Sequence, residues 1–309
     1  MSIKYQDREG SITPPYLKPG DKIGIVCTAR KISKKEIDFA VKKIKSWKLK
    51  LVFGNTIGES LNQYAGDDWL RAGDFQKMMD DVEIKAILCA RGGYGTVRII
   101  DRLDFSRFKQ NPKWIIGYSD ITVLHAHIHT QFNIETIHAS MPLSFRTNTK
   151  TALHSIRDAL FGKKLQYKVK PHRLNLEGKA QGQLIGGNLS VLYSICGSRS
   201  DLMTRDKILF IEDLDEYLYH VDRMMMQLKR AHKLRHLAGM IVGGFTRMKD
   251  NEVPYGKNAL EIIAEHAQDY GYPVAFGFPA GHISDNRALI LGRKVELVVE
   301  KTGSRLRFL

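Results

Sequence analysis

The chain has 309 residues, a length that suggests about two domains of ordinary size. Its 43% hydrophobic and 26% charged residues are typical of a globular protein, and its 26 glycines and 9 prolines exclude a collagen-like or low-complexity chain. Aromatic residues make up 9%, which together with the aliphatic residues is enough for a large core, so global disorder is excluded as well.

The charge balance is strongly basic, with 48 Lys and Arg against 33 Asp and Glu, or +15. Such an excess can indicate nucleic-acid binding. The basic residues, however, form short clusters separated by acidic residues, and the sequence contains no recognisable nucleic-acid-binding module. This pattern favours a solvated basic surface or one that attracts anionic ligands, and we predict no nucleic-acid partner.

The cysteines and the apolar segments indicate the setting in which the protein acts. Cys27, Cys89 and Cys196 are far apart and have no metal-ligand spacing, so we predict no metal and no cofactor. The first 21 residues lack the apolar core of an export signal, and no apolar stretch reaches the roughly 18 residues that a membrane span needs. We therefore expect a cytoplasmic protein with reduced cysteines and no membrane contact.

The first half of the chain alternates between strand and helix patterns. The apolar runs predict strands at 22–29, 51–55, 84–90, 113–119 and 134–140. Between them, helical spacing predicts helices at 34–48, 67–81, 96–103 and 120–132. Strands separated by helices of this length indicate βαβ units and a mostly parallel sheet, and hence an α/β fold.

A polar and basic segment at about 163–180 interrupts this alternation, and we take it as a linker between domains 1–165 and 166–309. After it, strands are predicted at 207–213, 237–245 and 272–278, with helices at 217–234 and 258–270. The tail at 287–300 has the pattern of a hairpin or of paired edge strands. The second domain is therefore also predicted to be α/β.

Reactive side chains follow several of the predicted strands. In an open parallel sheet, ligands bind beyond the carboxyl ends of the strands. Those ends carry the glycine turn at 91–95, Ser119, Glu212 and His282. A serine, a carboxylate, a histidine and a glycine turn are the groups that nucleophilic acyl transfer requires.

Two of these features have simpler alternatives. Ser119 fits a strand–turn–helix nucleophile elbow, but Ile121 stands at the last position of the usual GxSxG, and a serine before a helix can equally be an N-cap. Gly92 and Gly93 can bring a backbone N–H to an oxyanion or can simply form a tight turn. They lack the spacing of a dinucleotide-binding loop.

The other candidates are weighed in the same way. His282 lies in a loop rich in glycine and proline, which favours a functional role over a packed one. Glu212 can be a catalytic acid or a charge that complements the dipole of the next helix. His125 and His129 share a helix face, but no carboxylate ligands flank them, so metal binding is disfavoured.

Several longer motifs occur together and in one order. They are LKPGDKIGIV, ARGGYG, IGYSDIT, TIHAS, GGNLS, ILFIEDLDEYLYHVDRM and FGFPAGH, and they extend from about residue 17 to 298. In this combination the chain resembles the LD-carboxypeptidase family of serine peptidases, which includes muramoyltetrapeptide carboxypeptidases and microcin C immunity proteins. The resemblance implies a flavodoxin-like parallel-sheet domain followed by a swivelling-type α/β domain, with the active site in the cleft between them.

The resemblance also implies a catalytic triad. Ser119 in GYSD would be the nucleophile, His282 in AGH the general base, and Glu212, the first acid of EDLDE, the group that orients the base. Glu216 competes for the acidic role because it lies in the same motif. In addition, the backbone N–H of Asp120 and that of Gly93 or Gly92 would form the oxyanion hole.

The implied reaction is hydrolysis of the amide between the L-centre of a diamino acid and the terminal D-alanine of a cytoplasmic murein tetrapeptide, in peptidoglycan recycling. Such a substrate carries several carboxylates, which suits the basic chain, and Arg91 beside the glycine turn is a candidate for binding one of them. A homodimer is the candidate assembly. The alternative is a microcin C immunity-type peptidase that cleaves peptidyl or aminoacyl nucleotide amides.

Overall fold

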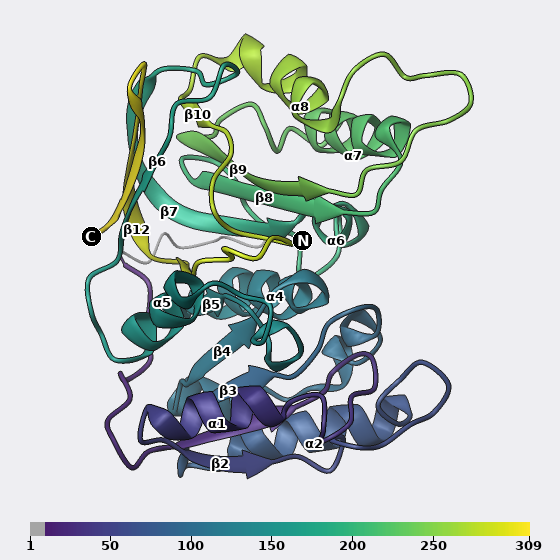
Figure 1. The fold of residues 1–309 in the computed structure, drawn as a ribbon, viewed down its shortest axis with the longest axis vertical. Coiled ribbons are helices and arrows are strands. Elements are labelled where there is room, and N and C mark those ends of the chain that lie inside the picture. Colours follow the sequence, from purple (N-terminus) through teal and green to yellow (C-terminus); the bar gives the residue numbers. More distant parts are fainter. Residues whose placement is uncertain (1–9) are drawn as a thin grey trace, which may run out of the picture.

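The computed structural model describes residues 10–309, and the start of the segment searched for an export signal, residues 1–9, lies outside that range (Figure 1). The strands are β1 Lys22–Val26, β2 Lys50–Phe53, β3 Ile84–Cys89, β4 Trp114–Gly117, β5 Thr136–His138, β6 Gln166–Val169, β7 Gly178–Asn188, β8 Ile208–Leu214, β9 Gly239–Thr246, β10 Val274–Ala275, β11 Leu289–Leu291, β12 Lys294–Glu300 and β13 Gly303–Phe308. The α-helices are α1 Asp38–Ser46, α2 Asp68–Asp80, α3 Ser106–Gln110, α4 Thr122–Phe132, α5 Lys150–Leu160, α6 Leu189–Ser194, α7 Leu218–Arg230 and α8 Ala259–Ala267.

The first sheet has the order β11-β5-β4-β3-β1-β2. Strands β1 to β5 run parallel in the flavodoxin-like order 2-1-3-4-5. The buried side chains of α1 and α5 belong to one apolar cluster, and those of α2 and α4 belong to another. This separation is expected when crossover helices cover both faces of a parallel sheet.

The second sheet has seven strands in the order β10-β9-β8-β7-β12-β13-β6. Strands β7 to β10 are parallel, whereas β12, β13 and β6 add antiparallel pairs along the other edge of β7. In Figure 1 this sheet lies above the first one, with α7 and α8 on its outer side. The predicted fold class, a parallel-sheet α/β domain followed by a second α/β domain, is confirmed.

Two segments differ from the sequence prediction. The segment 96–103, predicted as one helix, forms two short 3-10 turns, Thr96–Arg98 and Ile100–Arg102. The tail forms no hairpin within 287–300, because β11 pairs with β5 in the first sheet while β12 lies between β7 and β13 in the second. All three residues of β11 are buried, so this segment suits the covered edge of the first sheet, where it pairs with β5 and not with β12.

The apolar core extends through both halves of the chain. One cluster joins Ile44 of α1 to Leu306 of β13, and the other joins Phe75 of α2 to Met224 of α7. The halves are therefore packed into one body by continuous apolar contact. Among residues 10–309, none of the helices combines the length and the hydropathy that crossing a bilayer requires.

Candidate functional site

Ser119 lies directly after β4, at the turn into α4. Its φ is +63°, a left-handed conformation that serine rarely adopts and that costs about 1–3 kcal/mol. Within the described part of the chain the Ser119 side chain caps no helix, since α4 starts without a side-chain cap and the preceding turn has none either. The N-cap alternative therefore does not hold, and the strained turn has the form of a nucleophile elbow.

The glycine turn after β3 packs directly against Ser119. A Cβ at Gly92 would lie 3.2 Å from the Ser119 Cβ and 3.4 Å from its Oγ, so any larger side chain would crowd the hydroxyl. Gly93 has a φ of +114°, which favours glycine. Arg91, at the start of the turn, is half-buried and donates from Nη1 to the carbonyl of Lys31 at 3.0 Å.

Glu212 and His282 form a buried pair although they are 70 residues apart. The His282 Nδ1 lies 2.6 Å from the Glu212 Oε2, and the same oxygen accepts the His282 backbone N–H at 3.1 Å. Glu212 is fully buried on β8. A Cβ at Gly281 would lie 2.6 Å from the Glu212 Cβ, so glycine before the histidine lets the loop approach the strand.

The loop that carries His282 is fixed by contacts from several sides. The Asn286 Oδ1 accepts the Gly281 N–H at 2.8 Å, and the Thr246 hydroxyl donates to the His282 carbonyl at 3.2 Å. The ring of Tyr118 lies 4.7 Å from that of His282, centroid to centroid. Burial and the charge of Glu212 raise the pKa of Tyr118 to about 12, so its phenol stays neutral beside the imidazole. Because Tyr118 immediately precedes Ser119, this contact brings the serine turn and the histidine loop to one place.

The competing acid, Glu216, has a different partner. Its Oε2 lies 2.6 Å from the Nδ1 of His220, four residues further along, at the start of α7. Both side chains are partly exposed. Of the two glutamates in the motif, Glu212 is thus the one that contacts His282.

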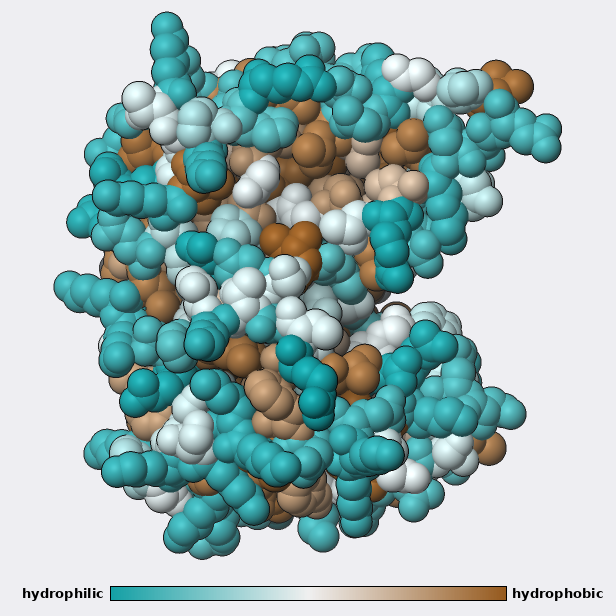
Figure 2. Space-filling view, in the orientation of Figure 1, coloured by the Kyte–Doolittle hydropathy of each residue, from teal (hydrophilic) through white to brown (hydrophobic). Residues whose placement is uncertain are grey.

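The two halves of the chain are joined around these residues. The Thr122 hydroxyl, three residues after Ser119, accepts the Asn188 N–H at 3.0 Å. The Thr149 hydroxyl donates to Asp285 at 2.8 Å, in the loop that follows His282. Figure 2 shows the surface hollowed between the halves, on the side toward which β8 and β9 point in Figure 1.

The histidines of α4 do not form a metal site. The His125 Nε2 lies 2.9 Å from the Gly117 carbonyl, and the His127 Nδ1 lies 3.0 Å from the Ser200 hydroxyl. Burial lowers the pKa of His125 to about 4 and that of His129 to about 3, so both rings are neutral. Within residues 10–309, no group of three or more His, Cys, Asp or Glu is placed to hold a metal ion.

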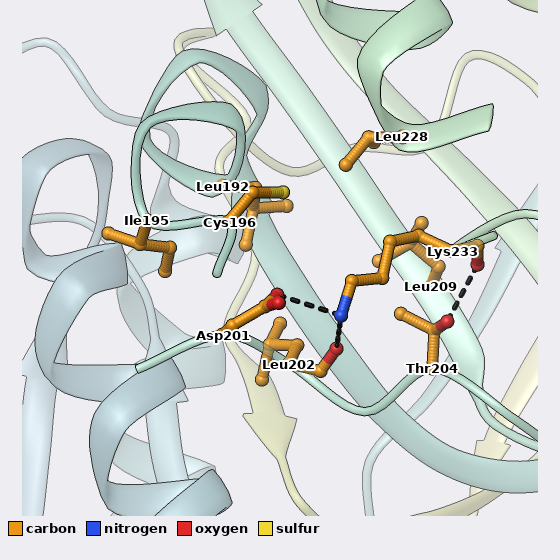
Figure 3. A pocket seen from close by; sticks show the side chains of 9 residues that line it. All are labelled: Leu192, Ile195, Cys196, Asp201, Leu202, Thr204, Leu209, Leu228 and Lys233. Carbon is orange, nitrogen blue, oxygen red and sulfur yellow. Dashed lines mark hydrogen bonds and ion pairs between the residues drawn. The ribbon is translucent and has the colours of Figure 1, made fainter. Parts of the chain in front are cut away.

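A separate cavity lies where the end of α6 meets β8 and α7 (Figure 3). Its single lysine, Lys233, is paired with Asp201 at 2.9 Å and donates to the Leu202 carbonyl at 2.8 Å. The remaining lining is largely apolar: Leu192, Ile195, Cys196, Thr204, Leu209 and Leu228. Because Lys233 already has an acidic partner and a carbonyl acceptor, the cavity has an apolar lining but no unpaired lysine for catalysis or binding.

Sequence reasoning missed the supporting roles of Tyr118 and Asn286. Tyr118 looked like the last apolar residue of a strand, and Asn286 like an ordinary loop residue. Their positions, one residue before the serine and four after the histidine, were the only available signal. The position of Tyr118 does not predict its contact with His282, because that contact depends on how the two halves pack, and the bond of Asn286 to Gly281 depends on the shape of the loop.

The serine on its strained turn packs against the glycine turn, and the histidine–glutamate pair contacts Tyr118, the residue before that serine; this arrangement is typical of serine hydrolases. Residues 23–139 match the LD-carboxypeptidase N-terminal domain, and residues 181–297 match the LD-carboxypeptidase C-terminal domain. The chain therefore belongs to the LD-carboxypeptidase family and is a serine-type carboxypeptidase.

Individual relatives agree with this assignment. A probable murein peptide carboxypeptidase of Bacillus subtilis is 36% identical over 305 residues, which cover 94% of this chain and 93% of the relative. A murein tetrapeptide carboxypeptidase of Pseudomonas aeruginosa is 28% identical over 300 residues, 93% of this chain and 95% of the relative.

Solved structures show the same fold. A muramoyltetrapeptide carboxypeptidase from Oxalobacter formigenes superposes with a TM-score of 0.85 at 23% identity, covering 93% of this chain and 98% of that one. The microcin C7 self-immunity protein in complex with aspartyl sulfamoyl adenosine gives the same TM-score of 0.85 and 23% identity, covering 96% and 98%.

Proposed function

We propose that the protein hydrolyses the amide between the L-centre of a diamino acid and the terminal D-alanine of murein tetrapeptides, using Ser119, His282 and Glu212 as a catalytic triad. The observation that carries the proposal is the fully buried Glu212 carboxylate 2.6 Å from the His282 Nδ1, with the ring of Tyr118 packed at a tilt against the same imidazole. The relatives in Bacillus subtilis and Pseudomonas aeruginosa, which are named for murein peptides, supply the substrate class.

The proposed proton path follows from the ring nitrogen that remains free. Glu212 occupies Nδ1, so Nε2 of His282 is the atom that takes the Ser119 proton as the hydroxyl attacks the amide carbonyl. The carboxylate holds the tautomer and stabilises the imidazolium that forms. His282 then gives this proton to the leaving amine of D-alanine, and a water molecule releases the acyl group by the same route in reverse.

The oxyanion of the tetrahedral intermediate needs hydrogen-bond donors. In the described chain the backbone N–H groups of Gly92 and Gly93 donate to no protein acceptor, so they are available to a ligand. We assign the oxyanion hole to one of these groups, with Gly93 preferred, together with the N–H of Asp120. One such donor typically contributes about 3–4 kcal/mol to catalysis.

The test of this function is mass spectrometry of a murein tetrapeptide before and after incubation with the protein. We expect loss of one alanine residue with the wild type and none with Ser119→Ala. The matched control is Ser194→Ala, whose exposed hydroxyl donates to the Val191 carbonyl at 2.8 Å and which has no role in the proposed chemistry. Retention of activity in Ser119→Ala would contradict the proposal that Ser119 is the nucleophile of a triad.

The net charge of +15 suits a substrate with several carboxylates. We propose that Arg91, beside the glycine turn, binds one of them. Screening by salt weakens such an attraction, so KM should rise with ionic strength while kcat stays nearly constant. A KM that does not change up to high salt, or that is unchanged by Arg91→Gln, would contradict the role of Arg91.

We also propose that the protein acts in the cytoplasm on peptides released during wall turnover. Cell fractionation tests this location.

The alternative substrate class is an aminoacyl or peptidyl nucleotide amide, as in the complex of the microcin C7 self-immunity protein. A nucleobase is best held between two parallel rings separated by about twice a stacking distance. Tyr64 and Tyr94, near the glycine turn, are 6.4 Å apart between centroids but tilted by 49°, so they contact each other and leave no slot. Comparing turnover of the tetrapeptide with that of an aminoacyl sulfamoyl adenosine decides between the two classes.

A further inference from the structure

Two buried charged groups near the serine and glycine turns have no role in the proposed mechanism. The carboxyl group of Asp120 is 3% exposed, and the guanidinium of Arg71 is completely buried on α2. Burying such groups is costly unless they are paired and hydrogen-bonded. Both of them bond to the backbone of the glycine turn, which makes the turn the natural place to look for their purpose.

Asp120 links the serine turn to the glycine turn. Its Oδ2 accepts the backbone N–H of Thr96 at 2.9 Å, at the end of the turn that begins with Gly92. The hydroxyl of Thr96 bonds in turn to that of Thr28 at 2.8 Å. Because Asp120 directly follows Ser119, its carboxylate fixes the distance between the nucleophile and the turn that packs on it.

Arg71 also bonds to the glycine turn. Its Nη1 donates to the Gly95 carbonyl at 3.0 Å and also to the Thr28 carbonyl, while its Nη2 pairs with Asp68. A Cβ at Gly95 would lie 2.7 Å from that Nη1, and Gly95 has a φ of +151°, so the guanidinium fits only against glycine. The turn is thus bonded through the Gly95 carbonyl and the Thr96 N–H on successive residues.

We propose that Asp120 and Arg71 are positioning residues that hold the glycine turn at the separation from Ser119 that the oxyanion hole requires. This inference rests on the proposed function, since it assigns a purpose to the N–H groups of Gly92 and Gly93. Preorganised donors act on the transition state more than on the bound substrate. Releasing the turn should therefore lower kcat and leave KM nearly unchanged.

The first test is Asp120→Ala, which removes the acceptor of the Thr96 N–H. We expect kcat to fall by about 100-fold, the loss typical of one oxyanion donor, with KM within about twofold. Asp120→Asn keeps an oxygen acceptor at the same place and should recover most of kcat. A peptide boronic acid that forms a tetrahedral adduct with Ser119 should lose affinity in parallel with kcat, whereas the tripeptide product should bind as before.

The chain provides a matched control for the structural cost. Asp74 is also buried, on the same helix as Arg71, and accepts the backbone N–H groups of Asn55 at 2.9 Å and Thr56 at 2.8 Å. Its turn lies after β2, away from the serine. Asp74→Ala should therefore lower Tm about as much as Asp120→Ala does and leave kcat nearly unchanged.

A second variant covers the case in which Asp120→Ala does not fold. Gly95→Ala leaves Asp120 intact but pushes on Arg71, and it should also lower kcat selectively. Gly58→Ala is its control, because Gly58 has a φ of +100° and its added Cβ would meet no described atom within 4 Å. Equal kcat losses in the test and control variants would overturn the inference. Failure of the proposed function is distinguished separately, by an active Ser119→Ala.

Discussion

Two histidine–glutamate pairs in this protein have the same contact and different surroundings. His282 with Glu212 and His220 with Glu216 both join Nδ1 to Oε2 at 2.6 Å. The second pair joins residues four apart where the chain enters α7, so local structure brings it together. The first spans 70 residues and exists only when the loop after β10 packs on β8. Glu212 is completely buried, whereas Glu216 retains 24% of its side-chain exposure.

The difference shows that a short imidazole–carboxylate contact does not by itself identify a catalytic pair. At the surface, water screens the charge and the pair is worth little. In a buried place the carboxylate is neither screened nor free to turn, and it fixes the tautomer and direction of the ring. The backbone N–H of His282 also donates to the same Glu212 oxygen, which orients the carboxylate as well as the imidazole.

The most severe way to test this contrast is to remove each imidazole. His282→Ala should lower kcat for D-alanine release by roughly 10⁶-fold, as expected for loss of the general base of a triad. His220→Ala should leave kcat within a few-fold, because only a surface pair is lost. Steady-state kinetics on the tetrapeptide, with circular dichroism to confirm folding, makes the measurement. Similar losses of kcat in the two variants would contradict the distinction between a catalytic pair and a structural pair.

Changing each carboxylate to an amide tests the acid separately. Glu212→Gln should cost about 10⁴-fold in kcat, because an amide can present the wrong partner to Nδ1 and cannot stabilise the imidazolium. Glu216→Gln preserves the size of the side chain and should have little effect. If Glu216→Gln is the damaging substitution, the acid of the triad has been assigned to the wrong glutamate.

A finer test shifts the loop that carries His282 relative to β8 without replacing His282 or Glu212. Gly281→Ala would place its Cβ 2.6 Å from that of Glu212 and 2.7 Å from its Oε2. We expect kcat to fall by about 100-fold, the cost of misplacing a catalytic group by about 1 Å. Gly271→Ala shares the positive φ, but its Cβ would meet no described atom within 4 Å, so Tm alone should fall. Unchanged kcat in Gly281→Ala would mean that the loop tolerates displacement.

The smallest expected effect concerns stability, and it comes from a buried histidine that has no carboxylate partner. Burial lowers the pKa of His125 from 6.5 to about 4, so the folded protein resists a proton that the unfolded chain accepts. Its contribution to stability is therefore complete above pH 6.5 and is lost as the pH falls toward 4, by about 3 kcal/mol.

Urea unfolding at several pH values between about 7 and about 4 measures this loss. His125→Gln removes the titrating group while keeping a donor for the Gly117 carbonyl, so its free energy of unfolding should fall less steeply on acidification. An acid sensitivity identical to that of the wild type would exclude His125 as a source of it.

The sequence predicted well those features that depend on local pattern. Strands such as 84–90 and helices such as 67–81 were placed within one or two residues, because apolar periodicity and the cap at Asp67 determine them. It could not predict the place of β11, since three apolar residues carry no information about which sheet receives them.

The candidate site followed the same division. Strand ends named Ser119, Glu212 and His282, but the motif alone could not separate Glu212 from Glu216, because that choice depends on which side chain the fold buries. The roles of Tyr118 and Asn286 were also beyond the sequence. Tyr118 acts by packing on His282, more than 150 residues away, and Asn286 acts through a bond to Gly281 that depends on the shape of their own loop.

The place of β11 also affects how the protein comes to be made. The free edge of β5 stays uncovered during synthesis until residues 289–291 have left the ribosome, because only that segment pairs with it. An open edge exposes unpaired backbone groups that invite association with other chains. A nascent polypeptide cut short before this point would carry every proposed catalytic side chain and still have an unfinished first sheet, so the nucleophile-bearing domain is completed by a segment that is made after the whole proposed triad.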